Sequence, residues 1–177
     1  MILIGLAGRK HSGKDTVHQA IKALHPTLKV ARVAFGDPLK QEVASTLGIT
    51  VADIENEKPR FRLILQWWGT EWRRHSNPSY WIDIAREHII KALANNDITV
   101  VTDVRFINEA NLIRSLGGRV IQVLRHRTTH TDQHPSETNL DSYHFDDFVH
   151  NYGDINNLQR EVANILPHHL LHEMPTR

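Results

Sequence analysis

A glycine-rich segment near the N-terminus decides which folds are open to this chain. Ile2–Ala7 is a continuous apolar run, as expected for a β-strand that is buried on both faces. Residues 8–16 (GRKHSGKDT) follow with the spacing G-x-x-x-x-G-K, and apolar residues at helical spacing then run from Thr16 to Leu24. Such a turn points backbone N–H groups inward and adds the positive end of a helix dipole. The sequence therefore predicts a P-loop that binds phosphate groups.

Within this segment the candidate nucleotide-binding residues are Gly8, Ser12, Gly13, Lys14 and Thr16. The glycines permit the tight curl of the backbone, and Lys14 is expected to reach the β- and γ-phosphates. We expect the Lys14 side chain to face solvent when no nucleotide is bound.

Asp15 stands where the P-loop pattern normally has the Ser or Thr that binds Mg²⁺. A carboxylate that faces a polyphosphate is repelled unless a cation or a proton lies between them. Asp15 is therefore a candidate ligand of the metal, or a residue that holds the acceptor or acts as a base. An acidic residue that is merely stabilised by the helix dipole is a third interpretation.

The rest of the chain alternates between strand and helix patterns. Further strands are predicted at Val30–Phe35, Ile98–Asp103, Arg119–Leu124 and Phe145–Val149, and helices at 37–47, within 50–96, at Asn108–Leu116 and at Asp154–Leu166. This alternation predicts a three-layer α/β fold of the P-loop NTPase type, with a parallel sheet. We expect one domain over residues 1–177, with a helical substrate-binding region at about 50–96 and a short polar lid at about 125–142. Ligands should bind at the carboxyl ends of the strands.

Composition excludes several classes of protein. The chain has no cysteine, so disulfide scaffolds, thiolate zinc sites and cysteine nucleophiles are excluded. Its 21 basic and 20 acidic residues give a net charge of +1, which argues against a nucleic-acid-binding protein. The longest apolar stretch, Met1–Ala7, is too short to span a membrane and lacks the features of a signal peptide. A cytoplasmic protein without a membrane partner is therefore expected.

A second candidate site follows the strand predicted at Ile98–Asp103. An acid in this position resembles the Walker B carboxylate that orients Mg²⁺, so Asp103 is a second candidate metal ligand. Arg105 is expected to face the same cleft, where its planar guanidinium group can donate two hydrogen bonds to a phosphate. Glu109 lies four residues after Arg105, so the two side chains are expected to pair on the first helical turn. A structural cluster without a ligand is the alternative.

Aromatic, basic and histidine-rich segments carry weaker signals. Helical spacing places most of the tryptophans at 67, 68, 72 and 81 in the core, and Trp81 is a candidate for contact with a base, weighed evenly against plain packing. The arginines at 60, 62, 73 and 74 read as a solvated face. The histidines at 126, 130 and 134 lie in a loop-like segment, where a metal site is not expected.

Several motifs recur in an order that resembles a known family. They are GxxxSGKDT at 8–16, F-x-D-P-L-K at 35–40, Q-x-x-G-T-E at 66–71, D-V-R-F-x-N-E-A at 103–110, H-P-S-E at 134–137 and D-x-x-x-x-N-x-G at 146–153. Together they resemble the phage-type deoxynucleoside monophosphate kinases, which have the P-loop nucleoside monophosphate kinase fold. The resemblance covers nearly the whole chain.

The resemblance implies transfer of the γ-phosphoryl group of ATP to a deoxynucleoside monophosphate (dNMP), with Mg²⁺ as cofactor, in a monomer or homodimer. The catalytic residues it implies are Lys14, Asp15, Asp103, Arg105, Glu109 and Arg125. The implied residues around the nucleotide donor are Gly8, Ser12, Gly13, Lys14, Thr16, Arg127, Asn151 and Gly153. The implied residues around the acceptor are Asp15, Lys40, Arg62, Gln66, Gly69, Thr70, Trp81, Arg105 and Glu109.

Two other functions are compatible with a P-loop. Another small-molecule kinase, such as a dephospho-coenzyme A kinase, would share the phosphate loop and the closing N-x-G segment. It would not need the Q-x-x-G-T and D-V-R-F-x-N-E-A segments. A module that binds ATP without transferring phosphate is the second alternative, against which the presence of Lys14, Asp103 and Arg105 argues.

Overall fold

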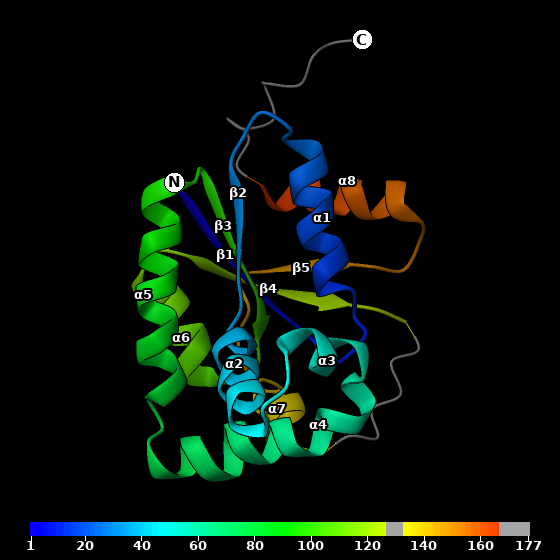
Figure 1. The fold of residues 1–177 in the computed structure, drawn as a ribbon. Helices are drawn as coiled ribbons and strands as arrows, with labels where there is room; N and C mark the ends of the chain where they lie inside the picture. Colours follow the sequence, from blue (N-terminus) through cyan, green and yellow to red (C-terminus); the bar gives the residue numbers. More distant parts are fainter. Residues whose placement is uncertain (127–132, 167–177) are drawn as a thin grey trace.

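Five strands form one parallel sheet through the centre of the molecule (Figure 1). The computed structural model describes residues 1–126 and 133–166 of the chain. The strands are β1 (Ile2–Ala7), β2 (Val30–Val33), β3 (Ile98–Val104), β4 (Arg119–Leu124) and β5 (Asp147–His150). Their order is β2-β3-β1-β4-β5, and each neighbouring pair is parallel. The apolar β1 therefore lies in the middle, as its continuous hydrophobicity predicts.

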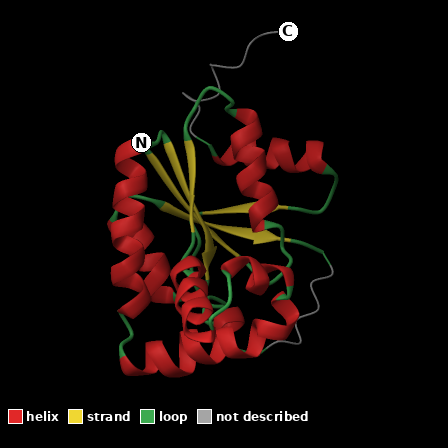
Figure 2. Ribbon diagram, in the orientation of Figure 1, coloured by secondary structure: helices red, strands yellow, loops and turns green. Residues whose placement is uncertain are grey.

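Helices cover both faces of the sheet (Figure 2). On one face, α1 (Lys14–Leu24) and α8 (Ile155–Ile165) bury an apolar cluster that includes Ile21, Val162 and Ile121 of β4. On the other face, α5 (Tyr80–Asn95) and α6 (Ile107–Ser115) bury a second cluster that includes Ile89 and Ile113. The prediction of a three-layer α/β fold with a parallel sheet is confirmed.

A second group of helices lies beside the carboxyl ends of the strands (Figure 1). They are α2 (Gly36–Leu47), α3 (Val51–Asn56), α4 (Lys58–Gln66), the π-helix η1 (Trp67–Arg74) and α7 (Pro135–Thr138). Helices α2 to η1 share a third apolar cluster, built around Val43, Ile54 and Trp68, into which Trp81 of α5 also packs. This separate cluster lets the helical region form a wall beside the sheet edge where ligands bind in such folds.

Local differences from the predicted elements have identifiable causes. Helix α1 begins at Lys14 instead of Thr16, directly after Gly13 in a left-handed conformation. Helix α2 begins at Gly36, one residue before the predicted start, and the Asp37 carboxylate on its first turn accepts a hydrogen bond from Arg32 at 2.7 Å. Helix α7 lies inside a segment that was expected to be a loop or lid.

The prediction that most tryptophans belong to the core is wrong for two of the four. Trp67 and Trp72 are 53 % and 38 % exposed, whereas Trp68 and Trp81 are buried. Trp67 and Trp72 stack on each other with ring centroids 5.8 Å apart. In a π-helix the backbone hydrogen bonds join positions i and i+5, which brings these positions closer together than an α-helix does, and an α-helical spacing could not predict this. Within the described residues, no helix is long and apolar enough to cross a membrane.

Candidate functional site

A cavity of about 1130 Å³ lies between the phosphate loop, the carboxyl ends of the strands and the helical region. Its size exceeds that of most single-ligand pockets, which is what two nucleotides would require. Most of the predicted site residues line it: Gly13, Lys14, Asp15, Thr16, Lys40, Arg62, Gln66, Gly69, Thr70, Trp81, Asp103, Arg105, Glu109 and Arg125. Residues that are distant in the sequence therefore share one space.

Two glycines shape the phosphate loop. Gly8 has a φ of +140°, and a side chain there would meet the Val123 carbonyl oxygen at 2.6 Å. Gly13 has a φ of +96°, and a side chain there would meet the Asn151 amide at 2.2 Å. Asn151 is close because its side-chain amide donates a hydrogen bond to the Ser12 carbonyl oxygen at 2.9 Å. The loop that follows β5 is thus fixed against the phosphate loop.

Lys14 does not face solvent, so that expectation is wrong. The residue is 9 % exposed, and its ammonium group donates hydrogen bonds to the carbonyl oxygens of Gly8 at 2.7 Å and Arg9 at 3.0 Å. Burial, followed by repulsion from Arg105, lowers the pKa of Lys14 to about 8. The curl of the loop encloses its own lysine, a geometry that residue spacing alone does not reveal.

Asp103 ties the end of β3 to the turn that precedes α2. Its two carboxylate oxygens accept hydrogen bonds from the backbone N–H groups of Phe35 and Gly36, both at 2.8 Å. A side chain at Gly36 would meet the second of these oxygens at 3.0 Å, which explains the glycine there. Asp103 still lines the cavity, as does the exposed Asp15 on the first turn of α1.

Glu109 pairs with a different arginine from the one that was expected. Its carboxylate forms a buried ion pair with Arg74 of η1, and Arg105 bonds to it through its backbone N–H, at 2.7 Å, and not through its side chain. The predicted side-chain pair between Arg105 and Glu109 is therefore wrong, as is the assignment of Arg74 to a solvated face. Arg74 is 13 % exposed and lies over the Phe106 ring at 3.9 Å. Sequence spacing could not predict the pair between Arg74 and Glu109, because the two residues are 35 positions apart.

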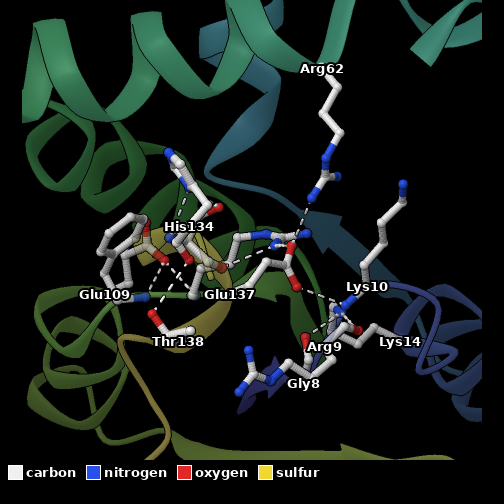
Figure 3. A network of polar contacts seen from close by, with 12 residues as sticks. Gly8, Arg9, Lys10, Lys14, Arg62, Glu109, His134, Glu137 and Thr138 are labelled. Carbon is white, nitrogen blue, oxygen red and sulfur yellow. Dashed lines mark hydrogen bonds and ion pairs between the residues drawn. The ribbon is translucent and has the colours of Figure 1, made fainter. Parts of the chain in front are cut away.

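The Arg105 side chain instead forms an ion pair with Glu137 of α7. Glu137 also accepts a hydrogen bond from the backbone N–H of Lys10 at 2.9 Å, and Arg62 approaches it at 3.6 Å (Figure 3). Reasoning from residue types did not single out Glu137. Glu137 is the last residue of the H-P-S-E motif. The first residue of that motif, His134, caps α7 by accepting a hydrogen bond from the Ser136 N–H at 3.1 Å.

The predicted acceptor residues form the helical wall of the cavity. Trp81 is 2 % exposed and its indole N–H donates to the Gly69 carbonyl oxygen at 2.9 Å, so it supports η1 by packing and also borders the cavity. Gly69 packs against Leu39, which a side chain would meet at 2.9 Å. The Lys40 ammonium forms an ion pair with Glu55 at 2.6 Å.

Some predicted residues lie at the edge of the cavity or outside the described ranges. Gly153 lies next to Asn157 at the start of α8 and does not line the cavity. Arg127, His130 and part of the expected lid fall within 127–132, outside the described residues. In residues 1–126 and 133–166, no group of three or more His, Cys, Asp or Glu residues could hold a metal ion.

Comparison with known proteins agrees with the resemblance seen in the motifs. The model of the deoxynucleotide monophosphate kinase family matches residues 43–162. A putative deoxynucleotide monophosphate kinase of Acanthamoeba polyphaga mimivirus is 32 % identical over 171 residues, covering 84 % of this chain and 87 % of the relative. The deoxynucleoside-5'-monophosphate kinase of Escherichia phage T5 is 35 % identical over 113 residues, covering 58 % of this chain and 44 % of the relative. Shikimate kinase from Aquifex aeolicus aligns with a TM-score of 0.47 and 12 % identity, over 92 % of this chain and 95 % of that one. From the family model and the mimivirus relative, the chain belongs to the deoxynucleotide monophosphate kinase family.

Proposed function

We propose that this chain transfers the γ-phosphoryl group of ATP to a dNMP, giving ADP and the deoxynucleoside diphosphate. An oxygen of the acceptor phosphate forms a bond to the γ-phosphorus, and the bond from that phosphorus to the oxygen shared with the β-phosphate breaks. The observation that carries the proposal is that one cavity is lined both by the phosphate loop and by the helical wall that bears Q-x-x-G-T. The donor and the acceptor would therefore meet inside a single cavity.

The phosphate loop supplies the donor side. The backbone of residues 8–16 would hold the ATP phosphates, with Lys14 turning its ammonium group from the loop carbonyls toward the β- and γ-phosphates. Arg125 would add positive charge, since its guanidinium contacts the His11 carbonyl oxygen at the rim of the loop. Asn151, fixed to Ser12, would border the adenine together with Gly153, and Arg127 is proposed on sequence position alone.

Asp15 and Asp103 are the residues that fit Mg²⁺. Magnesium prefers oxygen ligands and usually binds through one or two carboxylates together with substrate phosphates, instead of a cage made only of protein groups. The cavity offers this donor set, because both carboxylates line it beside Thr16. When bound, the ion would neutralise charge on the phosphates. Asp103 accepts two backbone hydrogen bonds, which would hold its carboxylate in place as a contact to the ion.

The helical wall would bind the acceptor. Arg62 and Arg105 reach the same space from α4 and the end of β3, and two guanidinium forks suit the phosphate of a dNMP. Gln66 and Thr70, with the Gly69 backbone, would contact the nucleoside, and Lys40 would add charge at the rim. Trp81 would border the base while it supports η1. Glu109 would act through the position of the Arg105 backbone.

Measurement of ADP formation tests this proposal. The purified protein would be incubated with Mg·ATP and separately with dAMP, dGMP, dCMP, dTMP, AMP and dephospho-coenzyme A. We expect turnover with one or more deoxynucleotides well above the rate without acceptor. Turnover with dephospho-coenzyme A alone would favour the alternative kinase. Tight ATP binding without any turnover would favour a non-catalytic module.

A further inference from the structure

Glu137 places a carboxylate among the cations of the phosphate-binding cavity (Figure 3). Its contacts come from three separate elements: the Lys10 N–H of the phosphate loop, Arg105 after β3 and Arg62 of α4. The side chain is only 3 % exposed. A carboxylate so enclosed, and held by groups from elements far apart in the chain, occupies a defined binding position.

The partners of Glu137 are the groups that recognise a phosphoryl group. A backbone N–H of a glycine-rich loop and two arginine forks bind the oxygens of carboxylates and phosphates by the same hydrogen-bond geometry. Burial opposes the charged form of Glu137, but Arg105, the Lys10 N–H and Lys14 together lower its pKa below the usual value. At neutral pH the cavity therefore already contains an anion.

The segment that carries Glu137 is fastened by contacts that can be released. Asp141 binds the guanidinium of Arg9 with both oxygens at 2.7 Å, and the imidazole of His134 approaches Glu71 at 3.0 Å. Asp141 and Glu71 are 56 % and 46 % exposed, so these contacts exchange with water at little cost. Helix α7 itself spans four residues. Withdrawal of Glu137 therefore needs a movement of α7 only, ahead of Leu140, which stays buried in the apolar cluster of α5 and α6.

We propose that Glu137 is a placeholder anion, which occupies a phosphoryl position of the ligand-free kinase and must be displaced when phosphorylated ligands bind. The inference rests on the proposed function for the identity of those ligands. A phosphoryl group and the Glu137 carboxylate compete for Arg105 and for the Lys10 N–H. Glu137 thereby neutralises part of the charge of Arg105 and Arg62 while the cavity is empty. It also weakens the binding of phosphate compounds.

The affinity for inorganic pyrophosphate, without metal and with EDTA present, tests this directly. Titration calorimetry on the full chain would compare the wild type with Glu137→Gln, which keeps the shape of the side chain and removes its charge. We expect the dissociation constant to fall at least tenfold in Glu137→Gln. Glu137→Asp, which keeps the charge but retracts it by one methylene, should give an intermediate value.

Glu57→Gln is the matched control. It also replaces a carboxylate by its amide, but Glu57 pairs with the exposed Arg60 and neither residue lines the cavity. Its dissociation constant should equal that of the wild type. An unchanged or weaker affinity in Glu137→Gln would overturn the proposal, and weaker affinity would make Glu137 a support for Arg105 instead. Circular dichroism and thermal melting of each variant verify folding, and the Glu137→Asp series decides the question if Glu137→Gln does not fold.

Pyrophosphate separates this inference from the proposed function. Because the probe carries no nucleoside, its binding depends on the phosphate cavity and not on which acceptor the enzyme uses. Tighter pyrophosphate binding in Glu137→Gln together with no turnover of any dNMP would support the placeholder role of Glu137 and overturn the proposed reaction. Turnover of a dNMP without any gain in pyrophosphate affinity would support the proposed reaction and overturn the placeholder role.

Discussion

Arg74, on the last turn of η1, forms a buried ion pair with Glu109 on the first turn of α6. The Glu109 side chain is 1 % exposed, and its second oxygen accepts the backbone N–H groups of Arg105 at 2.7 Å and Phe106 at 3.2 Å. Burial raises the pKa of Glu109, an effect that Arg74 opposes. The pair thus joins the helical wall to the strand end that carries Arg105, and so fixes the distance across the cavity.

Replacement of Arg74 by methionine should destabilise the protein. The change leaves a buried carboxylate without its cation, which typically costs about 3–5 kcal/mol of unfolding free energy. Because Arg74 holds down the pKa of Glu109, its loss lets that pKa rise further. The destabilisation should therefore be larger at pH 7, where the unfolded carboxylate is ionised, than at pH 5, where Glu109 can remain protonated in the folded state. Urea unfolding at both pH values measures this difference.

Arg60→Met is the control for that experiment. Arg60 lies in the same helical region and pairs with Glu57 at 2.8 Å, but the Arg60 side chain is 73 % exposed. Its replacement should leave the urea midpoint unchanged, because solvent screens exposed pairs. Equal midpoints for Arg74→Met and the wild type would show that Glu109 is already neutral and that the pair contributes nothing.

The sequence predicted the sheet and its covering helices because their signals are local. A continuous apolar strand such as Ile2–Ala7, a glycine turn and an amphipathic helix each depend on neighbouring residues. Arg119–Leu124 was predicted to the residue for this reason. The π-helix was not foreseen, since its hydrogen-bond period depends on packing against Glu42 and Trp81 as well as on its own sequence.

The cavity was predicted from topology, whereas its ion pairs were not. Residues after parallel strands meet at one edge, so Lys14 and Asp103 were expected to share a space. Which arginine meets which carboxylate depends on where α7 and η1 fold back. The sequence spacing of Arg105 and Glu109 suggested a pair that the fold replaces with Arg105–Glu137 and Arg74–Glu109.

Replacement of Arg105 by alanine should lower kcat by about 10³-fold or more, because a phosphate-facing arginine contributes on that scale to phosphoryl transfer. Steady-state ADP formation with saturating ATP and dNMP measures it. Arg114→Ala, which removes another arginine–carboxylate pair (Arg114–Asp146, 2.8 Å) away from the cavity, should keep kcat at the wild-type value. A drop in melting temperature without a drop in kcat would instead make Arg105 a structural residue.

Binding of ATP at pH 9 should take up protons. Lys14 has a pKa of about 8 in the ligand-free enzyme, so at pH 9 most of its amine is neutral. A polyphosphate beside it favours the ammonium form and raises that pKa. Uptake should therefore approach one proton per ATP at pH 9 and fall to about a quarter of a proton at pH 7.5. Asp15, Asp103 and Glu137 also face Lys14, and their negative charges oppose the lowering of its pKa.

Calorimetry in buffers with different ionisation enthalpies, without metal, gives the number of protons directly. Lys22→Met, on the exposed face of the same helix, is the control and should show the wild-type uptake. No uptake at pH 9 in the wild type would mean that Lys14 is already charged in the empty cavity and that its burial does not lower its pKa.

Asp15 and Asp103 should respond differently to replacement by asparagine. Both changes remove a proposed Mg²⁺ contact, so the Mg²⁺ concentration that gives half-maximal activity should rise in each. Only Asp103 also accepts two backbone hydrogen bonds, and an asparagine amide turned toward the Phe35 or Gly36 N–H would lose one of them. Asp103→Asn should therefore lower the unfolding free energy by about 1–3 kcal/mol. Asp15→Asn, at an exposed position, should not lower it.

Activity measured across a Mg²⁺ titration, together with urea unfolding of the metal-free protein, separates these effects. A higher KM for the dNMP in Asp15→Asn, without any change in its Mg²⁺ dependence, would assign Asp15 to the acceptor instead of the metal. Unchanged Mg²⁺ dependence in Asp103→Asn would leave Asp103 with only its structural role, because its hydrogen bonds to the turn before α2 account for the stability loss on their own.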